Sequence, residues 1–374
     1  DNKEGIIFKK KIELDDKYLF KISQEIQNNS SKNLELYPYA QITRNKIPDD
    51  IQNFYISHEG FIGVFDDELK EDDYDDVEDN KIVREANEGW LGITDKYWMT
   101  VLVPEKGKNF KSTFQYNDAF KANYIINDPV KINASSNGSN NFRLFVAAKE
   151  VNTIDTYAET QKINKLDLVI DWGWFYFFTK PLFFVIDYLF KFSGNFGIAI
   201  VLITLAIRAL FFPLANFSFR SMAKMKAVTP EMTRLKELHK DDKVKLQQEM
   251  MALYRKEKIN PAAGCLPVLI QIPFFFAIYK MLFISLEMRH QPFFGWIQDL
   301  SAADPTSIFN LFGLIPWSPP SFMIIGIWPI LMGASMWVQQ KLNPAPTDPI
   351  QAKIFAFFPL FLTIILASFP SGLV

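Results

Sequence analysis

The pattern of hydrophobic and polar positions divides the chain into two unlike parts. From Ile6 to Val146, apolar and polar residues form many short segments, which clusters of Asn, Gly, Pro and Asp separate. This spacing is typical of short strands joined by turns and predicts an antiparallel β-sandwich. From about residue 166 onward, long apolar segments dominate instead. Segments of that length predict membrane-spanning helices.

Four segments illustrate the strand pattern of the first part. They are YLFKISQEI (18–26), FYISHEGFIGVF (54–65), YWMTVLVP (97–104) and FRLFVAA (142–148). The acidic segment from Asp66 to Asp79 interrupts this pattern, and we expect it to be a solvated, mobile loop. A calcium site there would need a fixed ligand geometry that the segment lacks.

Four apolar segments of the second part are long enough, with their flanks, to cross a membrane. They cover about 196–214, 264–286, 322–340 and 354–370. The aromatic segment from Trp172 to Phe192 is different, because Lys180, Pro181 and Asp187 interrupt it. Two charges and a proline favour a helix along the membrane interface, where Trp and Tyr concentrate. A further span is the alternative.

The charged segment after the first span, from Leu214 to Lys258, contains more basic than acidic residues. Its basic side chains include Lys224, Lys226, Arg234, Lys236, Lys243 and Lys245. The positive-inside rule places this loop in the cytoplasm and the β part outside. Thr229 with Pro230 marks the start of one helix, and Asp241 or Asp242 the start of another, so we expect a helical hairpin. Its surface could bind anionic lipid, ribosomal RNA or a partner protein, or be merely solvated.

The first apolar span carries an arginine, Arg208, roughly 9 Å from its inner end. The apolar residues of the span can outweigh the roughly 2.5–3.5 kcal/mol that one central Arg costs. An ionisable residue inside a membrane is a candidate functional residue, because it must face protein or water. A side chain that snorkels to the nearer headgroups is the alternative.

Other polar residues lie at similar depth on the same or neighbouring spans. They are Thr204, Gln271, Ser335 and, somewhat deeper, Thr363. Together with Arg208 they predict a water-containing cavity open to the cytoplasm, although a single Thr or Ser can instead bond its own helix. Met332 and Met336, one turn apart, offer either an adaptable apolar surface beside that cavity or ordinary helix packing.

Several kinds of chemistry have no support in the sequence. No Asp or Glu occurs inside the four spans, so a proton relay or cation site is not expected. Motifs of serine hydrolases, phosphate-binding loops and zinc proteases are missing, and the single Cys265 has no nearby His. The formal net charge of -2 gives no general attraction to DNA. We therefore expect a protein that is not an enzyme and has no metal or cofactor.

Several segments resemble the bacterial YidC membrane protein insertases, which are relatives of mitochondrial and chloroplast insertases. They are GNFGIAIVLITLAIRALFFPL (194–214), SMAKMKAVTPEMTRLKE (221–237), QQEMMALYRKEKINPAAGCLPVLIQIPFFFAIYKML (247–282), TDPIQAKIFAFFP (347–359) and FPSGLV (369–374). The resemblance implies a periplasmic β-super-sandwich and a helical membrane core with a hydrophilic groove. It also implies that Arg208 is the groove's positive charge, that Thr204 is its neighbour and that residues 218–260 receive clients.

From this resemblance we expect an N-terminally truncated periplasmic β domain over 1–165. A linker and an interfacial amphipathic helix over 166–193 and a transmembrane insertase core over 194–374 follow. An anchor span before the β domain and a sixth span after FPSGL, both features of the family, are expected to lie outside this sequence.

The expected function is that of an insertase and chaperone of the bacterial inner membrane, acting alone or with a secretion translocon. Its expected partners are nascent membrane proteins, lipids and the ribosome. The alternative is a small-anion transporter that uses Arg208 as its binding charge, although no inverted repeat is evident. A membrane-tethered β binding module is a third class, in which Arg208 would be dispensable.

Overall fold

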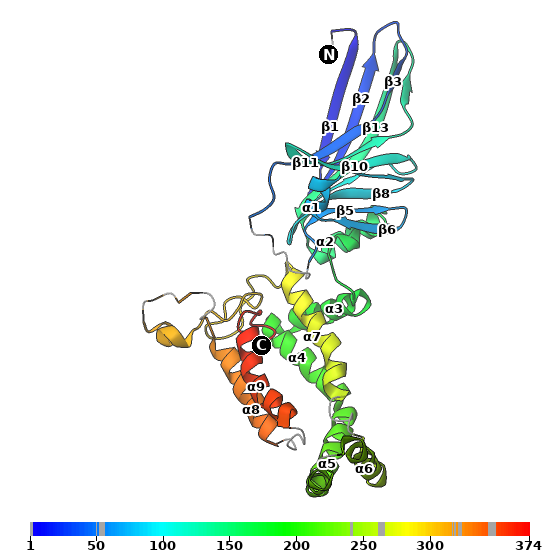
Figure 1. Ribbon diagram of the computed structural model, residues 1–374. Coiled ribbons are helices and arrows are strands. Elements are labelled where there is room, and N and C mark those ends of the chain that lie inside the picture. Colours follow the sequence, from blue (N-terminus) through cyan, green and yellow to red (C-terminus); the bar gives the residue numbers. More distant parts are fainter. Residues whose placement is uncertain are drawn as a thin grey trace. The chain divides into compact units, whose positions relative to one another are not determined.

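The computed structural model describes residues 3–49, 51, 57–239, 242–260, 266–315, 317, 319–320, 324–342 and 349–374. The chain forms two compact units. The first comprises Asp1–Gly173 with Ile284–Glu287, and the second Trp174–Phe283 with Met288–Val374. The strands lie in the first unit and the long helices in the second (Figure 1).

The first unit contains two antiparallel sheets and a short two-stranded ribbon. The larger sheet has the order β1 (Ile6–Leu14), β2 (Leu19–Asn28), β13 (Ser136–Ala148), β9 (Trp98–Val103), β8 (Gly89–Thr94), β5 (Gly60–Phe65) and β6 (Glu68–Asp72). The smaller sheet has the order β4 (Tyr39–Arg44), β11 (Ala119–Ile126), β10 (Phe110–Asn117) and β7 (Ile82–Ala86). The ribbon pairs β12 (Val130–Ile132) with β3 (Leu34–Leu36).

Apolar side chains from both sheets pack together in one core. On β10, Phe110 and Phe114 are buried while Lys111 between them is exposed, which is the period of two expected of a half-buried strand. Phe114 meets Phe61 of the opposite sheet with ring centroids 5.0 Å apart. The predicted β-sandwich is therefore confirmed, because the two sheets face each other across a shared hydrophobic layer.

The acidic segment that we expected to be a mobile loop is instead structured. It forms β6 and helix α1 (Tyr74–Asp79). Tyr74 and Val77 are 4% and 1% exposed, so the helix is anchored in the core despite its acidic surface. Arg84 donates two hydrogen bonds to Asp72, at 2.7 and 2.8 Å. The prediction was wrong because it relied on the many acidic residues of the segment and overlooked Tyr74 and Val77, two apolar side chains large enough to anchor a helix in the core.

Helix α2 (Val151–Thr160) and the short helix η1 (Leu166–Val169) cover the other face of the larger sheet. Tyr157 packs edge-on against Phe145, with ring centroids 5.1 Å apart. Phe145 points away from the sandwich core because it is an odd number of positions from the core residue Phe142. This arrangement places the C-terminal end of α2 over β13, an inner strand of the sheet.

The second unit is helical. Its helices are α3 (Tyr176–Ser193), α4 (Phe196–Leu210), α5 (Phe212–Leu238), α6 (Lys243–Lys256), α7 (Leu266–Ile284), η3 (Ile308–Gly313), α8 (Ile327–Leu342) and α9 (Pro349–Leu366). In the described parts of the chain, no helix taken singly has both the length and the apolar character needed to cross a membrane. Helices α4 and α5 meet that requirement only as a pair, with a bend of 61° between them.

The first predicted apolar span is not one straight helix. Helix α4 ends at Leu210, and Phe211 makes its last backbone hydrogen bond, to Ile207 at 3.0 Å. Pro213 follows at the start of α5. Because proline has no N–H to continue the ladder and its ring clashes with the preceding turn, the helix changes direction there.

The hairpin after this bend forms, but with different helix limits. Helix α5 runs through Pro230 without interruption, so the expected helix start at Thr229 is wrong. The Thr229 hydroxyl instead donates to the carbonyl of Met225, one turn earlier. Asp242 caps α6 by accepting the N–H of Lys245 at 2.9 Å, as predicted. The alternative cap, Asp241, lies outside the described residues.

Candidate functional site

A cavity of about 830 Å³ lies in the second unit. Its walls come from α4, the first turns of α5, and α7, with further residues from α8, from the segment around 293–300 and from residues 371–374. Most lining side chains are apolar. Gly197 and Arg208 both line it, so the cavity follows α4 for roughly 16 Å at about 1.5 Å per residue.

The structure brings three of the predicted site residues together in this cavity. Arg208 and Thr204 line it from α4, and Gln271 lines it from α7. Arg208 has an exposed side chain, and no carboxylate in the described part of the chain lies within 4.0 Å of its guanidinium. The Thr204 hydroxyl donates to the Ile200 carbonyl at 2.7 Å. The cavity thus combines apolar walls with a charge that the described residues do not neutralise.

The other predicted site residues lie elsewhere on α8 and α9. Ser335, Met332, Met336 and Thr363 are not among the residues that line the cavity. The Ser335 hydroxyl donates to the Met332 carbonyl at 2.7 Å, and the Thr363 hydroxyl donates to its own helix in the same way. A Cβ on Gly333 would overlap the Thr363 hydroxyl, so this pair belongs to the packing between α8 and α9. A role of these four residues in client binding stays a prediction.

Two polar residues of the cavity were missed from the sequence. Gln339 lines it from α8, four positions after Ser335 and hence on the same helix face, which is the signal that could have found it. Ser218 lines it from α5 and is 1% exposed. Its hydroxyl has no hydrogen-bond partner among the described residues. No sequence signal distinguishes this serine from its neighbours.

One end of the cavity is built from segments far apart in the sequence. The ring of Phe293 packs so closely on Gly197 that a Cβ there would overlap it. The Ser371 N–H and hydroxyl both donate to the Ala302 carbonyl, at 2.7 and 2.8 Å. The next residue, Gly372, donates its N–H to Leu300. The FPSGL segment is therefore part of the cavity wall.

A buried carboxylate holds the start of α8 beside this wall. Asp304 is 2% exposed and accepts hydrogen bonds from the Trp296 indole at 3.1 Å and from the Thr306 N–H and hydroxyl at 3.0 and 2.6 Å. Its second oxygen accepts the backbone N–H of Trp328 at 3.0 Å. Trp328 lines the cavity, so Asp304 fixes one wall residue by capping the positive end of α8.

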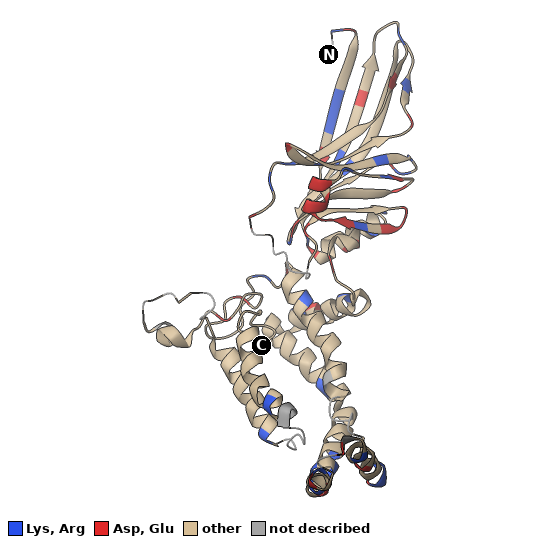
Figure 2. Ribbon diagram, in the orientation of Figure 1, with Lys and Arg blue, Asp and Glu red and all other residues tan. Residues whose placement is uncertain are grey.

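The basic residues predicted for the hairpin lie on α5 and α6. Lys224, Lys226, Arg234 and Lys236 are on α5, and Lys243 and Lys245 begin α6. Figure 2 shows Lys and Arg gathered on these two helices, in contrast with the mostly uncharged α4, α8 and α9. Met232 is 1% exposed, and the Ser221 hydroxyl donates to the Asn260 carbonyl at 3.2 Å. These contacts hold the hairpin closed while its charges stay on the surface.

No metal site emerges from this geometry. Among the residues that the structure describes, no three His, Cys, Asp or Glu side chains are grouped so that they could hold an ion. The described residues that line the cavity include no Asp, Glu, His, Cys or Lys. The arrangement can bind and orient an anionic or amphipathic chain, but it offers no nucleophile paired with a base.

Two family models together match almost the whole chain. The model described as 60Kd inner membrane protein matches residues 188–374, and the model of the YidC periplasmic domain matches residues 1–185. The membrane protein insertase YidC of Pelagibacter ubique (strain HTCC1062) is 61% identical over 373 residues, which are 100% of this chain and 67% of that protein. The insertase of the same name from Brucella melitensis biotype 1 is 49% identical over 379 residues, 100% of this chain and 62% of that protein.

A solved structure titled as an active YidC insertase with its first transmembrane domain resolved is also similar to this chain. The match covers 98% of this chain and 91% of that one, with a TM-score of 0.42 and 16% sequence identity. The chain spans 67% and 62% of the length of the two relatives named above.

Proposed function

Since this chain belongs to the YidC family of membrane protein insertases, we propose that it inserts membrane proteins and helps them fold. The family is one of inner membrane proteins with a periplasmic domain. The observation that carries the proposal is the cavity around Arg208, whose guanidinium has no carboxylate partner in the described part of the chain. Such a charge attracts an anionic group from a visiting polypeptide.

The cavity supports a mechanism in which a polar segment of a client enters first. A client carboxylate about 8 Å from Arg208 gains roughly 2 kcal/mol at an effective dielectric constant of about 20. The apolar walls, which include Leu205, Phe274 and Ile278, accept the hydrophobic part of the client, which then moves into lipid. Burial of apolar surface drives this step, so no nucleotide and no covalent chemistry is required.

The topology of the proposed insertase follows from charge and hydropathy. We propose that the apolar segments from α4 to α9 cross the inner membrane, with the hairpin α5–α6 in the cytoplasm and the β unit in the periplasm. The basic hairpin surface then meets nascent chains, the ribosome or anionic lipid. Helix α3 lies along the interface, because Phe177, Tyr188 and Phe192 are exposed while Phe183 and Ile186 are buried. A secretion translocon is a further proposed partner.

The replacement Arg208→Ala, introduced into the full-length protein, tests this proposal. We expect the insertion rate of small clients with acidic translocated segments to fall about tenfold, which corresponds to about 1.4 kcal/mol of lost attraction. Arg208→Lys should largely restore insertion, because it keeps the charge. Insertion is measured by protease protection of radiolabelled clients in proteoliposomes.

Matched clients and crosslinking sites provide the controls. Clients whose acidic residues are replaced by Asn and Gln should insert equally with Arg208 and with Ala at that position. A photo-crosslinker at Gln271 should capture the client, whereas one at Ile364, which is 53% exposed and outside the cavity lining, should not. Loss of anion uptake without any client adduct would support a small-anion transporter instead.

A further inference from the structure

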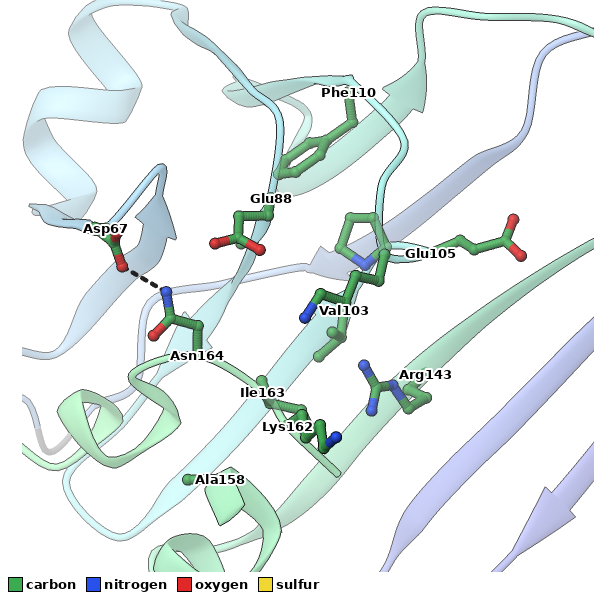
Figure 3. Close-up of a pocket in the computed structure, with 13 residues that line it drawn as sticks. Asp67, Glu88, Val103, Glu105, Phe110, Arg143, Ala158, Lys162, Ile163 and Asn164 are labelled. Atoms are coloured by element: carbon green, nitrogen blue, oxygen red, sulfur yellow. Dashed lines mark hydrogen bonds between the residues drawn. The ribbon is translucent and has the colours of Figure 1, made fainter. Parts of the chain in front are cut away.

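The first unit contains a second pocket, of about 520 Å³, that the proposed function does not use. It lies beside the C-terminal end of α2, and its walls come from the turn after β5, the start of β8, the loop between β9 and β10, and β13 (Figure 3). Its volume falls in the range of about 300 to 1,000 Å³ typical of small-ligand sites.

The walls of this pocket are held in place by hydrogen bonds between distant segments. The Asn164 side-chain amide donates to the Asp67 carboxylate at 2.5 Å, and the Lys165 ammonium donates to the Asp67 carbonyl at 2.6 Å. The indole of Trp90, which is 0% exposed, donates to the Asn164 carbonyl at 3.0 Å. A ligand would therefore meet a preformed site and would not have to order these loops.

One side of the pocket carries basic groups that the described residues leave without acidic partners. Arg143 of β13 donates one hydrogen bond, at 2.7 Å, to the carbonyl of Gln161, which ends α2. No carboxylate in the described part of the chain lies within 4.0 Å of Arg143, and the same holds for Lys162 beside it. Burial lowers the pKa of Arg143, yet a guanidinium stays charged at neutral pH. Most of its N–H groups therefore remain available to an anion.

The opposite side of the pocket is acidic. Figure 3 shows Glu88 and Asp67 across the pocket from Arg143 and Lys162. The Asp67 carboxylate already has Lys165 at 3.7 Å and Asn164 as partners. Glu88 forms no ion pair with any described residue. Glu105 and Lys106 also line the pocket, and Figure 3 shows the Glu105 side chain on the Arg143 side but extending away from the space between Arg143 and Glu88. Within that space, Arg143 and Lys162 therefore face Glu88 and Asp67.

This division selects one class of ligand. A phosphate ester or an anionic lipid headgroup, neither of which carries a positive group, would place two or more negative oxygens near Glu88, which costs energy. A polypeptide segment carries single carboxylates. A backbone N–H group or a Lys ammonium lies only a few bonds from such a carboxylate and can donate to Glu88. We propose that this pocket binds an extended polypeptide segment, with an acidic side chain on Arg143 and Lys162 and an N–H donor on Glu88.

A peptide-binding measurement on the full-length protein in detergent tests this assignment. The probe is a fluorescent, acetylated and amidated pentapeptide with one glutamate and one lysine, compared with the same peptide carrying glutamine. We expect fluorescence anisotropy to show about tenfold tighter binding of the glutamate peptide. Arg143→Met should abolish this preference, and Lys162→Met should weaken it about threefold. Lys121→Met, on the smaller sheet and outside the pocket, should leave it unchanged.

Further arms separate the possible failures. Glu88→Gln should weaken binding of the lysine-containing peptide, and it removes no ion pair with a described residue, so it tests the site even if Arg143→Met fails to fold. Arg208→Ala should bind the peptide like the native protein, because the two sites are in different units. The proposal would be overturned if the glutamate and glutamine peptides bound equally well. It would also be overturned if inorganic phosphate displaced the fluorescent peptide at a lower concentration than the unlabelled glutamate peptide does.

Discussion

Replacement of Asp304 by alanine should destabilise the second unit by about 4 kcal/mol. The carboxylate is 2% exposed and accepts four hydrogen bonds, from Trp296, twice from Thr306, and from Trp328. A fully buried donor left without an acceptor costs about 1–3 kcal/mol, these part-buried donors cost less, and the lost cap of α8 costs about 1 kcal/mol more. Part of this sum is recovered when water or neighbouring carbonyls replace the carboxylate.

Denaturant titrations of the purified protein in detergent, followed by tryptophan fluorescence, measure this effect. Asp304→Asn keeps one acceptor oxygen and should lose about half as much. Gly326→Ala should disturb the same hydrogen bonds without removing the carboxylate, because the added Cβ would overlap the Asp304 side chain. Asp299→Ala is the control and should lower the midpoint less, since among the described residues the hydrogen bonds that this carboxylate accepts come from its own loop, from His290 and Ser301. A midpoint for Asp304→Ala equal to that of the native protein would contradict this account.

Raising the pH from 8 to 10.5 should stabilise the first unit by about 3 kcal/mol more in the native protein than in Lys149→Met. Lys149 is 2% exposed, and its burial lowers its pKa to about 8, against 10.5 for an ordinary lysine, although Asp171, Glu59, Asp95 and Glu71 partly oppose this shift. Between these pH values the unfolded chain holds a proton that the folded chain has released. Stability therefore rises with pH in this window, and the full cost of the buried charge applies below pH 8.

Urea titrations at pH 7.5, 9 and 10.5, followed by the far-UV circular dichroism of the sheets, measure this difference. Other lysines and tyrosines titrate in the same range, but they contribute equally to both proteins and cancel. Lys131→Met on β12 is the matched control, because that side chain is exposed and should leave the pH dependence unchanged. Parallel stability curves for the native protein and Lys149→Met would show that the buried ammonium is not the cause.

The sequence predicted secondary-structure elements correctly where residues close together in the chain determine the local structure. The patterns of YWMTVLVP (97–104) and FRLFVAA (142–148) predicted strands, which the structure has as β9 and β13, because alternation with a period of two gives a strand one buried face. Asp242 predicted the start of α6 because its cap bond spans only three residues. The same reasoning failed for α1, where Tyr74 and Val77 are only two apolar positions in an acidic segment. It also failed at Pro230, which α5 accommodates without a break.

The candidate site was only partly accessible in this way. Arg208, Thr204 and Gln271 were found because each is a polar residue in an apolar segment, and each lines the cavity. Ser335 was chosen on the same grounds, yet Gln339 one turn later lines the cavity instead. Because these two residues share one face of α8, the error lies in the level at which that face meets the cavity, and this level depends on how α8 packs against the neighbouring segments.

The sequence by itself determined the two-part character of this protein, its family, and the presence of a charge within an apolar segment. These follow from periodicity, hydropathy and motifs, which involve residues close together in the chain. The tertiary structure alone decided that Asp304 caps a helix that begins more than twenty residues later, and that FPSGL closes the cavity against Ala302. It also decided that Arg143 faces Glu88 across a pocket. Such contacts join residues that are far apart in the sequence, so they depend on the tertiary fold. The local sequence pattern around a polar group does not identify its distant partner.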